Sequence, residues 1–184
     1  MRQGRNGKHV RVTSGAGGSS RPLDIAVTNA GVARWGPVAE IGEDDFDAVF
    51  QLNAKGTFFA LAEAARRISD GGRIINVTSS ATAMSIPGLA LYVGSKAAGE
   101  QFAKTLAREL GPRRVTVNNI SPGFTETDML PADPGYRSMA AGMSPLGRLG
   151  QVDDIADVVA FLVSDDARWI TGQNIQAGGG VVTA

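Results

Sequence analysis

Short apolar segments alternate with longer amphipathic stretches from Leu23 to the end of the chain, and this alternation restricts the possible folds more than any other feature. Short apolar runs bounded by glycine or polar residues are typical of buried strands, whereas apolar residues recurring every three or four positions are typical of helices. Their alternation predicts the α/β class, with a parallel sheet joined by right-handed crossovers. We expect strands at residues 23–27, 73–78, 115–120 and 173–177, helices at 43–69, 91–110 and 152–163, and an irregular connection over 121–142.

The first 21 residues lie outside this pattern. They contain five basic residues, no acidic residue and many glycines and serines. Such a composition buries little apolar surface and predicts disorder, so we expect one folded domain over residues 22–184. The alternative interpretation is a basic arm that binds nucleic acid. The whole chain argues against a nucleic-acid partner, because its 18 basic residues are balanced by 18 acidic ones.

The composition excludes several kinds of protein. The chain has no cysteine, which excludes disulfides, thiolate catalysis and cysteine metal sites and is typical of an intracellular protein. Its single histidine, His9, lies in the N-terminal segment, and we expect no metal site. No apolar run approaches the roughly 20 residues of a membrane-spanning helix, and the first residues lack the apolar core of a signal peptide. We therefore expect a cytoplasmic protein with no membrane partner.

Tyr92 and Lys96 are four residues apart in a predicted helix and therefore share one of its faces. There the lysine ammonium can lower the pKa of the phenol from its reference value of about 10. Ser79 precedes the tyrosine by thirteen residues, at the end of a predicted strand, where its hydroxyl can hold a substrate oxygen. Ser80, one residue closer, is the alternative. Such a set can move a proton to or from a carbonyl or an alcohol.

Five short segments, in this order along the chain, resemble the short-chain dehydrogenase/reductase family, and within it the 3-oxoacyl-[acyl-carrier-protein] reductase-like branch. They are residues 28–31 (TNAG), 53–56 (NAKG), 73–80 (RIINVTSS), 92–96 (YVGSK) and 121–127 (SPGFTET). The resemblance covers residues 22–184 and implies a Rossmann-like parallel sheet with flanking helices. It also implies an NAD(P)-dependent oxidoreductase that reduces a ketone, or oxidises a secondary alcohol, by hydride transfer. A 3-oxoacyl thioester is one candidate for its small-molecule substrate.

The resemblance assigns roles to individual residues. Tyr92 is implied to be the general acid/base, and Lys96 to assist it and to bind the nicotinamide ribose. Ser79, which the family spacing favours over Ser80, is implied to hold the substrate oxygen. Asn53 is implied to hold a water of the proton relay, although its amide could instead satisfy a neighbouring backbone carbonyl. The residues implied to contact the cofactor are Asn29, Ala30, Gly31, Tyr92, Lys96, Pro122, Gly123 and Thr127.

Thr28 and Gly178 are among the positions that depart from the family pattern. Thr28 replaces an asparagine that is usual at the end of the first matching strand, which puts a structural hydrogen bond in doubt. Gly178 stands where an aspartate is common, so we expect one turn or interface contact to be lost.

One unit of the family pattern is missing. The family opens with a strand and a glycine-rich turn at a helix N-terminus, which holds the pyrophosphate of the cofactor. Residues 13–18 (TSGAGG) have suitable residue types but follow no predicted strand and precede no predicted helix. We therefore expect a partial domain that lacks the N-terminal strands of the fold, has an unpaired sheet edge and binds dinucleotide weakly. A truncated or misread upstream region would explain the gap, and the choice between NADP and NAD is not revealed.

The two long predicted helices, 43–69 and 91–110, are those through which family members usually assemble. The resemblance therefore implies a homodimer or a homotetramer. A different class of function also fits, namely a non-catalytic remnant that keeps this helical interface and only oligomerises. The complete set of Asn53, Ser79, Tyr92 and Lys96 favours the enzyme, whereas the missing glycine-rich turn favours the remnant. Residues 129–143, which would shape the substrate pocket, carry no specific signal.

Overall fold

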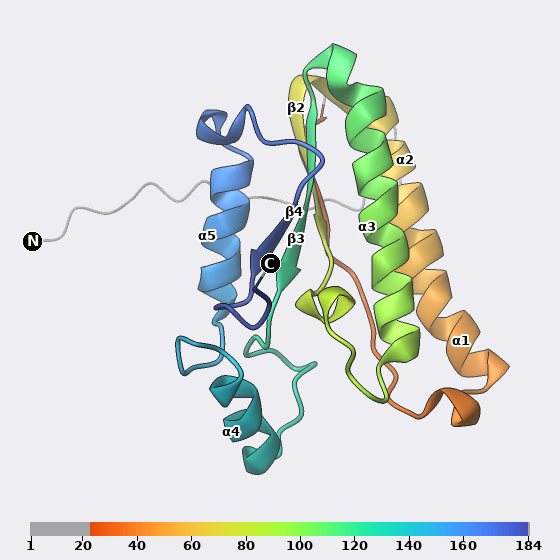
Figure 1. Ribbon diagram of the computed structural model, residues 1–184. Helices are drawn as coiled ribbons and strands as arrows, with labels where there is room; N and C mark the ends of the chain where they lie inside the picture. Colours follow the sequence, from red (N-terminus) through yellow and green to blue (C-terminus); the bar gives the residue numbers. More distant parts are fainter. Residues whose placement is uncertain (1–22, 184) are drawn as a thin grey trace, which may run out of the picture.

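A computed structural model describes residues 23–183 as a parallel four-stranded sheet with helices on both of its faces (Figure 1). Its strands lie side by side in the order β1–β2–β3–β4, and every neighbouring pair is parallel. The predicted α/β fold with a parallel sheet is therefore confirmed, and each predicted strand is present. The strands are β1 (Leu23–Thr28), β2 (Ile68–Val77), β3 (Thr116–Pro122) and β4 (Asn174–Ala177).

The helices divide between the two faces and one end of the sheet. Figure 1 shows α2 and α3 side by side on one face, with α1 leading into α2, and α5 alone on the other face. α4 lies at the end toward which the strands point. Short 3₁₀ turns occur at Val38–Glu40, Ser80–Ala83, Gly111–Arg113 and Asp165–Ala167. The α-helices are α1 (Glu43–Phe50), α2 (Thr57–Arg67), α3 (Ala90–Leu110), α4 (Pro134–Gly142) and α5 (Val152–Leu162).

Two consecutive isoleucines of β2 show how the sheet divides the core. Ile74 packs in a cluster with Leu61 of α2 and Leu106 of α3, whereas Ile75 packs in a second cluster with Leu162 of α5. Both isoleucines are fully buried. Successive side chains of a strand point to opposite faces, so a strand covered by helices on both sides is apolar at consecutive positions. This is why the sequence shows short apolar runs rather than strict alternation.

A chain of side-chain hydrogen bonds joins three strands to α3. Thr28 Oγ1 donates to Asn76 Oδ1 at 2.8 Å, and Asn76 Nδ2 donates to Asn119 Oδ1 at 2.8 Å. Asn119 Nδ2 in turn donates to the backbone oxygen of Glu100 at 3.1 Å. The threonine hydroxyl thus makes a cross-strand hydrogen bond at the position where the departure from the family pattern put one in doubt.

The predicted helix 43–69 is wrong in its middle and at its end. α1 and α2 are separated by a π-helical turn at Gln51–Gly56, and α2 ends at Arg67. β2 then begins five residues earlier than predicted, because Ile68 already pairs with Leu23. The next pair joins Ile25 to Arg73, so the intervening residues of β2 bulge, and Gly71 there has a φ of 78°. Glycine adopts this left-handed conformation without steric cost, which allows the strand to continue beyond the bulge.

The connection predicted as irregular over 121–142 also contains a helix. α4 begins after Asp133, whose Oδ1 accepts a hydrogen bond from the backbone N–H of Tyr136 at 2.7 Å. Pro134 occupies the first helical position, where its missing N–H and fixed φ are favourable. An aspartate followed by a proline is a helix-start signal, so this helix was readable from the sequence.

The outer edge of β1 is open in the described part of the chain. Among residues 23–183, β1 pairs with β2 and with no other strand. The unpaired edge that the sequence predicts stays a prediction, because residues 1–22 lie outside the described range. The segment predicted to be disordered, residues 1–21, and the glycine cluster within it lie outside the described residues. None of the helices in the described range combines the length and the hydropathy that a membrane span requires.

Candidate active site

The predicted site residues gather where the parallel strands end. Gly31 follows β1, Ser79 follows β2 and Gly123 follows β3, and the carboxyl ends of parallel strands share one edge of a sheet. α3 passes this edge in its first turns and brings Tyr92 and Lys96 to it. Figure 1 shows the strand arrowheads pointing to the end of the molecule where α4 lies.

Tyr92 and Ser79 line the same cavity. Tyr92 is only 9% exposed, and the Ser79 side chain is close enough to the phenol to affect its pKa. Burial raises the pKa of Tyr92 above its usual value, and the Ser79 side chain opposes this rise. The sequence predicts a pKa lowered by Lys96, so the direction found here is the opposite, because loss of water around the phenol has the larger effect.

Lys96 is buried one helical turn beyond the tyrosine. Its Nζ donates to the backbone oxygen of Val77 at 3.1 Å. Burial lowers the pKa of this lysine from 10.5 to about 8. Gly31 leaves the space that the ammonium group occupies, since a Cβ at that glycine would lie 2.9 Å from Lys96 Nζ. The predicted cofactor residue Gly31 therefore touches the predicted catalytic lysine.

Asn53 lies in the π-helical turn and is 1% exposed. Its Oδ1 accepts from the backbone N–H of Val32 at 2.9 Å, and its Nδ2 donates to the backbone oxygen of Val32 at 2.8 Å and to Ser95 Oγ at 2.9 Å. The amide therefore fixes the segment after β1 against α3, which matches the alternative interpretation of this residue. Its part in a proton relay stays a prediction. A π-helical turn is a frequent feature of functional sites.

The two candidate serines have different surroundings. Ser80 is 2% exposed, and its Oγ lies 2.9 Å from both the backbone oxygen of Ser121 and Oε1 of Gln176. It therefore ties the turn after β2 to β3 and β4. Ser79 is the serine that affects the pKa of Tyr92, and its Oγ accepts from the backbone N–H of Ala81 at 3.2 Å. The geometry supports Ser79 as the group facing a substrate oxygen.

Glu100 is a site residue that sequence reasoning missed. Its Oε1 accepts hydrogen bonds from the hydroxyls of Thr78 and Thr82, both at 2.5 Å. These threonines flank Ser79 on the turn after β2, so the carboxylate fixes the position of the serine. Glu100 stands four residues after Lys96 and eight after Tyr92, and this spacing on one helix face was a readable signal.

Replacing Glu100 with alanine is expected to lower kcat about tenfold with little change in KM, because Ser79 loses its fixed position and a charge-assisted hydrogen bond is worth about 1.5–3 kcal/mol. Glu100→Gln keeps an acceptor and is expected to recover most of the loss. Steady-state kinetics of both variants test this positioning role. Equal losses in the two variants, or a change confined to KM, would contradict it.

Gly123 makes a close backbone contact that holds the segment after β3. A Cβ at this position would lie 2.7 Å from Gly178 Cα and 2.9 Å from the Gly178 backbone oxygen. A Cβ at Gly178 would meet Ser80 Oγ at 2.9 Å, so the glycine that replaces the usual aspartate fits a crowded position. Of the other residues implied to contact the cofactor, Pro122 and Thr127 line the cavity beside Tyr92, and Asn29 and Ala30 are exposed just after β1.

Gly123→Ala is expected to destabilise the protein by about 1–3 kcal/mol, because backbone rather than a flexible side chain would have to move. Gly111→Ala is the matched control, since nothing lies within 4 Å of a Cβ there and Gly111 has helical dihedral angles. Urea unfolding of both variants measures the difference. If Gly123→Ala proved as stable as the control, the tight contact with Gly178 would be disproved.

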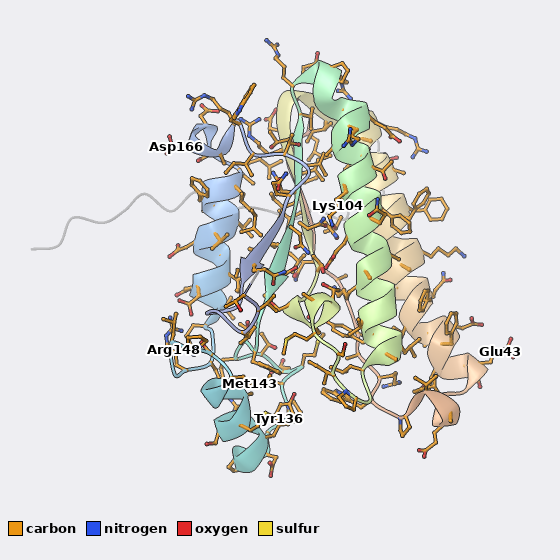
Figure 2. The ribbon with its side chains drawn as sticks, viewed as in Figure 1. Glu43, Lys104, Tyr136, Met143, Arg148 and Asp166 are labelled. Atoms are coloured by element: carbon orange, nitrogen blue, oxygen red, sulfur yellow. The ribbon has the colours of Figure 1, made fainter. Side chains whose placement is uncertain are left out.

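Beyond Ser79 and Tyr92 lies a mostly apolar cavity of about 120 Å³. Three aromatic residues from separate segments form part of its wall, namely Trp35 after β1, Phe124 after β3 and Tyr136 of α4. Figure 2 shows Tyr136 on α4, at the end of the sheet where the site lies. No local pattern in the sequence indicates this wall, because its three members are far apart along the chain. In the described residues, no group of His, Asp or Glu is placed to hold a metal ion.

Comparison with known proteins gives a family match. The family model described as enoyl-(acyl carrier protein) reductase matches residues 8–182. An uncharacterized oxidoreductase of Methylorubrum extorquens is 43% identical over 163 residues, covering 86% of this chain and 66% of the relative. A short-chain type dehydrogenase/reductase of Picea abies is 42% identical over 167 residues, covering 88% and 62%. The chain thus spans slightly less than two thirds of the length of these relatives.

The chain is also similar to solved structures of reductases. The angucycline C-6 ketoreductase LanV, crystallised with bound NADP, superposes with a TM-score of 0.83 at 44% identity. The match covers 87% of this chain and 63% of that enzyme.

Proposed function

The chain belongs to the short-chain dehydrogenase/reductase family, and from this we infer that it is an NAD(P)-dependent oxidoreductase that reduces a ketone or oxidises the corresponding secondary alcohol. The observation that carries the proposal is the placement of Ser79 and Tyr92 in the lining of one cavity, one helical turn from the buried ammonium group of Lys96. A proton donor, an oxygen-binding hydroxyl and a cation at one sheet edge are the groups that carbonyl reduction needs.

The pKa values decide which proton moves. Burial raises the pKa of Tyr92, so the phenol is protonated at neutral pH and can donate to the carbonyl oxygen. Lys96, whose pKa is about 8, is mostly charged at neutral pH and can stabilise the phenolate left behind. Ser79 is proposed to donate a hydrogen bond to the same carbonyl oxygen. When bound, a reduced nicotinamide cofactor supplies the hydride that the carbonyl carbon accepts.

The residues near the strand ends fit the nicotinamide half of such a cofactor. Gly31 leaves room for the buried Lys96 ammonium group, and Asn29 and Ala30 beside it are exposed. We propose that these residues, with Tyr92, Lys96, Pro122, Gly123 and Thr127, hold that half of the cofactor. The NADP in the ketoreductase LanV supports NADP as the cofactor, with NAD as the alternative.

We also propose that the protein forms a homodimer or homotetramer in the cytoplasm through its long helices. Large side chains remain exposed on α1 and α2, including Phe46, Phe58 and Phe59, the last of them 57% exposed. Exposed apolar residues gathered on neighbouring helices are typical of an interface between subunits.

Calorimetric titration with NADPH and NADH tests the proposed function. We expect saturable binding to the chain and weaker binding to Lys96→Ala, because the proposed contact with the cofactor is removed. Binding that is absent even at millimolar dinucleotide would favour the alternative function, a non-catalytic remnant that only oligomerises.

A further inference from the structure

The cavity beside Ser79 and Tyr92 has a wall without charge. Among the described residues, no Asp, Glu, Lys or Arg side chain lines it, and apolar surface predominates. Charged ligands are held by charged or strongly polar groups, whereas an apolar wall binds uncharged surface. The cavity therefore selects against a carboxylate or phosphate near the reacting carbonyl.

Three aromatic rings shape the cavity as one cluster. The ring of Tyr136 lies edge-on to Trp35, with centroids 6.2 Å apart and planes at 89°, and edge-on to Phe124, at 6.3 Å and 79°. Rings in this arrangement attract one another beyond their apolar contact. Trp35 remains 49% exposed, so part of an aromatic surface is free at the mouth.

The helix that carries Tyr136 is fixed against the site. Asp133 caps α4 by accepting from the backbone N–H of Tyr136, and Arg137 forms an ion pair with Glu126 in the segment after β3. These contacts hold the Tyr136 ring on the wall without relying on a ligand. The wall is therefore built before a substrate arrives, which reduces the entropic cost of binding.

Two arginines near the cavity form ion pairs in the described part of the chain. Arg34, next to Trp35, pairs with Asp45 at 3.1 Å, and Arg137 pairs with Glu126. A thioester of coenzyme A or of a carrier protein carries a phosphate at the far end of its pantetheine arm, outside the cavity, and an unpaired cation would be the usual partner for it. The arrangement favours a substrate that lacks a phosphate.

We propose that the ketone reduced at this site is an uncharged, flat, ring-containing compound rather than a 3-oxoacyl thioester. A cavity of about 150 Å³ holds one benzene ring, so the 120 Å³ here fits about one ring next to the carbonyl. Further rings would lie on the exposed face of Trp35. This inference rests on the proposed ketone reduction at Ser79 and Tyr92, and it names the substrate class of that site.

Fluorescence of single-tryptophan variants tests binding without any cofactor, with the bicyclic aryl ketone 1-tetralone as the probe. The chain contains two tryptophans, and Trp169 is 95% exposed, away from the cavity wall. Trp169→Phe leaves Trp35 as the reporter and is expected to show a saturable change. Trp35→Phe leaves Trp169 and is expected to show only linear, collisional quenching. Linear quenching in both variants would overturn the inference.

Calorimetry with the same ketone tests the aromatic wall. Tyr136→Ala is expected to weaken binding of 1-tetralone about tenfold, because a ring contact is lost. Met139→Ala is the matched control, since Met139 lies on the same helix, is exposed and does not line the cavity. Equal affinities of the two variants would remove Tyr136 from the proposal.

Turnover separates this inference from the proposed function. With NADPH, we expect kcat/KM for 1-tetralone to exceed that for acetoacetyl-coenzyme A, a 3-oxoacyl thioester that carries phosphates, by at least tenfold. The reverse preference would overturn the substrate class and leave ketone reduction in place. Saturable binding of 1-tetralone with reduction of neither compound would overturn the proposed function and leave the binding site in place.

Discussion

Tyr92→Phe is expected to lower kcat by about 10³-fold, because the variant has no proton to give to the carbonyl oxygen. Dinucleotide affinity should change little, and the free energy of unfolding by about 1 kcal/mol, since only one hydroxyl is removed from a buried ring. Steady-state kinetics, calorimetric titration with NADPH and urea unfolding measure the three quantities.

The expected pattern distinguishes a catalytic tyrosine from a packing residue. Tyr92 belongs to a small cluster with Ala81 and Leu89, and a residue that served only this cluster would tolerate phenylalanine without loss of rate. A variant that keeps full kcat would therefore refute the proton-donor role. A variant that loses activity together with its fold would point to packing, and Ser79→Ala would then be the cleaner test of the same site.

The rate of ketone reduction is expected to fall about tenfold per pH unit above pH 8, because Lys96 loses its proton there. The sign follows from burial, which lowers the lysine pKa from 10.5 to about 8, so the charged form that stabilises a phenolate predominates only below that pH. Loss of the Tyr92 proton lies higher, since burial raises its pKa above 10.0. The alkaline decline near pH 8 therefore reports the lysine alone.

Lys96→Arg is expected to remove this decline, because the guanidinium group stays protonated throughout the range in which a protein is studied. The plateau rate should also be lower, since the larger planar group cannot occupy the space that Gly31 leaves for the ammonium. Profiles of kcat against pH for the two proteins give the comparison. An unchanged alkaline decline in the arginine variant would assign the titrating group elsewhere.

The strands and most helix positions could be predicted because they depend on local patterns. The apolar run around Ile74 and Ile75 predicts a strand buried on both faces, and these residues pack in two separate clusters. The break between α1 and α2 was not predictable from periodicity, because a π-helical turn adds a residue to one turn without changing the residue types. The early start of β2 depends on pairing with Leu23, which no local pattern contains.

The sequence indicated candidate site residues, but it did not indicate the pKa shift of Tyr92 or the aromatic wall of the cavity. The spacing of Tyr92 and Lys96, and the family resemblance for Ser79, indicated these residues, and the structure brings them to one sheet edge. The direction of the Tyr92 pKa shift was missed, because it depends on how far surrounding elements exclude water. The aromatic wall was missed for a similar reason, since Trp35 and Tyr136 are a hundred positions apart in the sequence.

Transfer of deuterium from NADPH labelled at C4 of the nicotinamide tests the central claim most directly. With millimolar cofactor and 1-tetralone, one deuterium is expected on the carbinol carbon of the product, from only one of the two C4 epimers, and mass spectrometry detects it. The Tyr92→Phe variant should form about a thousandfold less of this product in the same time. Absence of deuterium from the product with either epimer, in protein that binds NADPH saturably, would contradict the assignment of this site as a reductase.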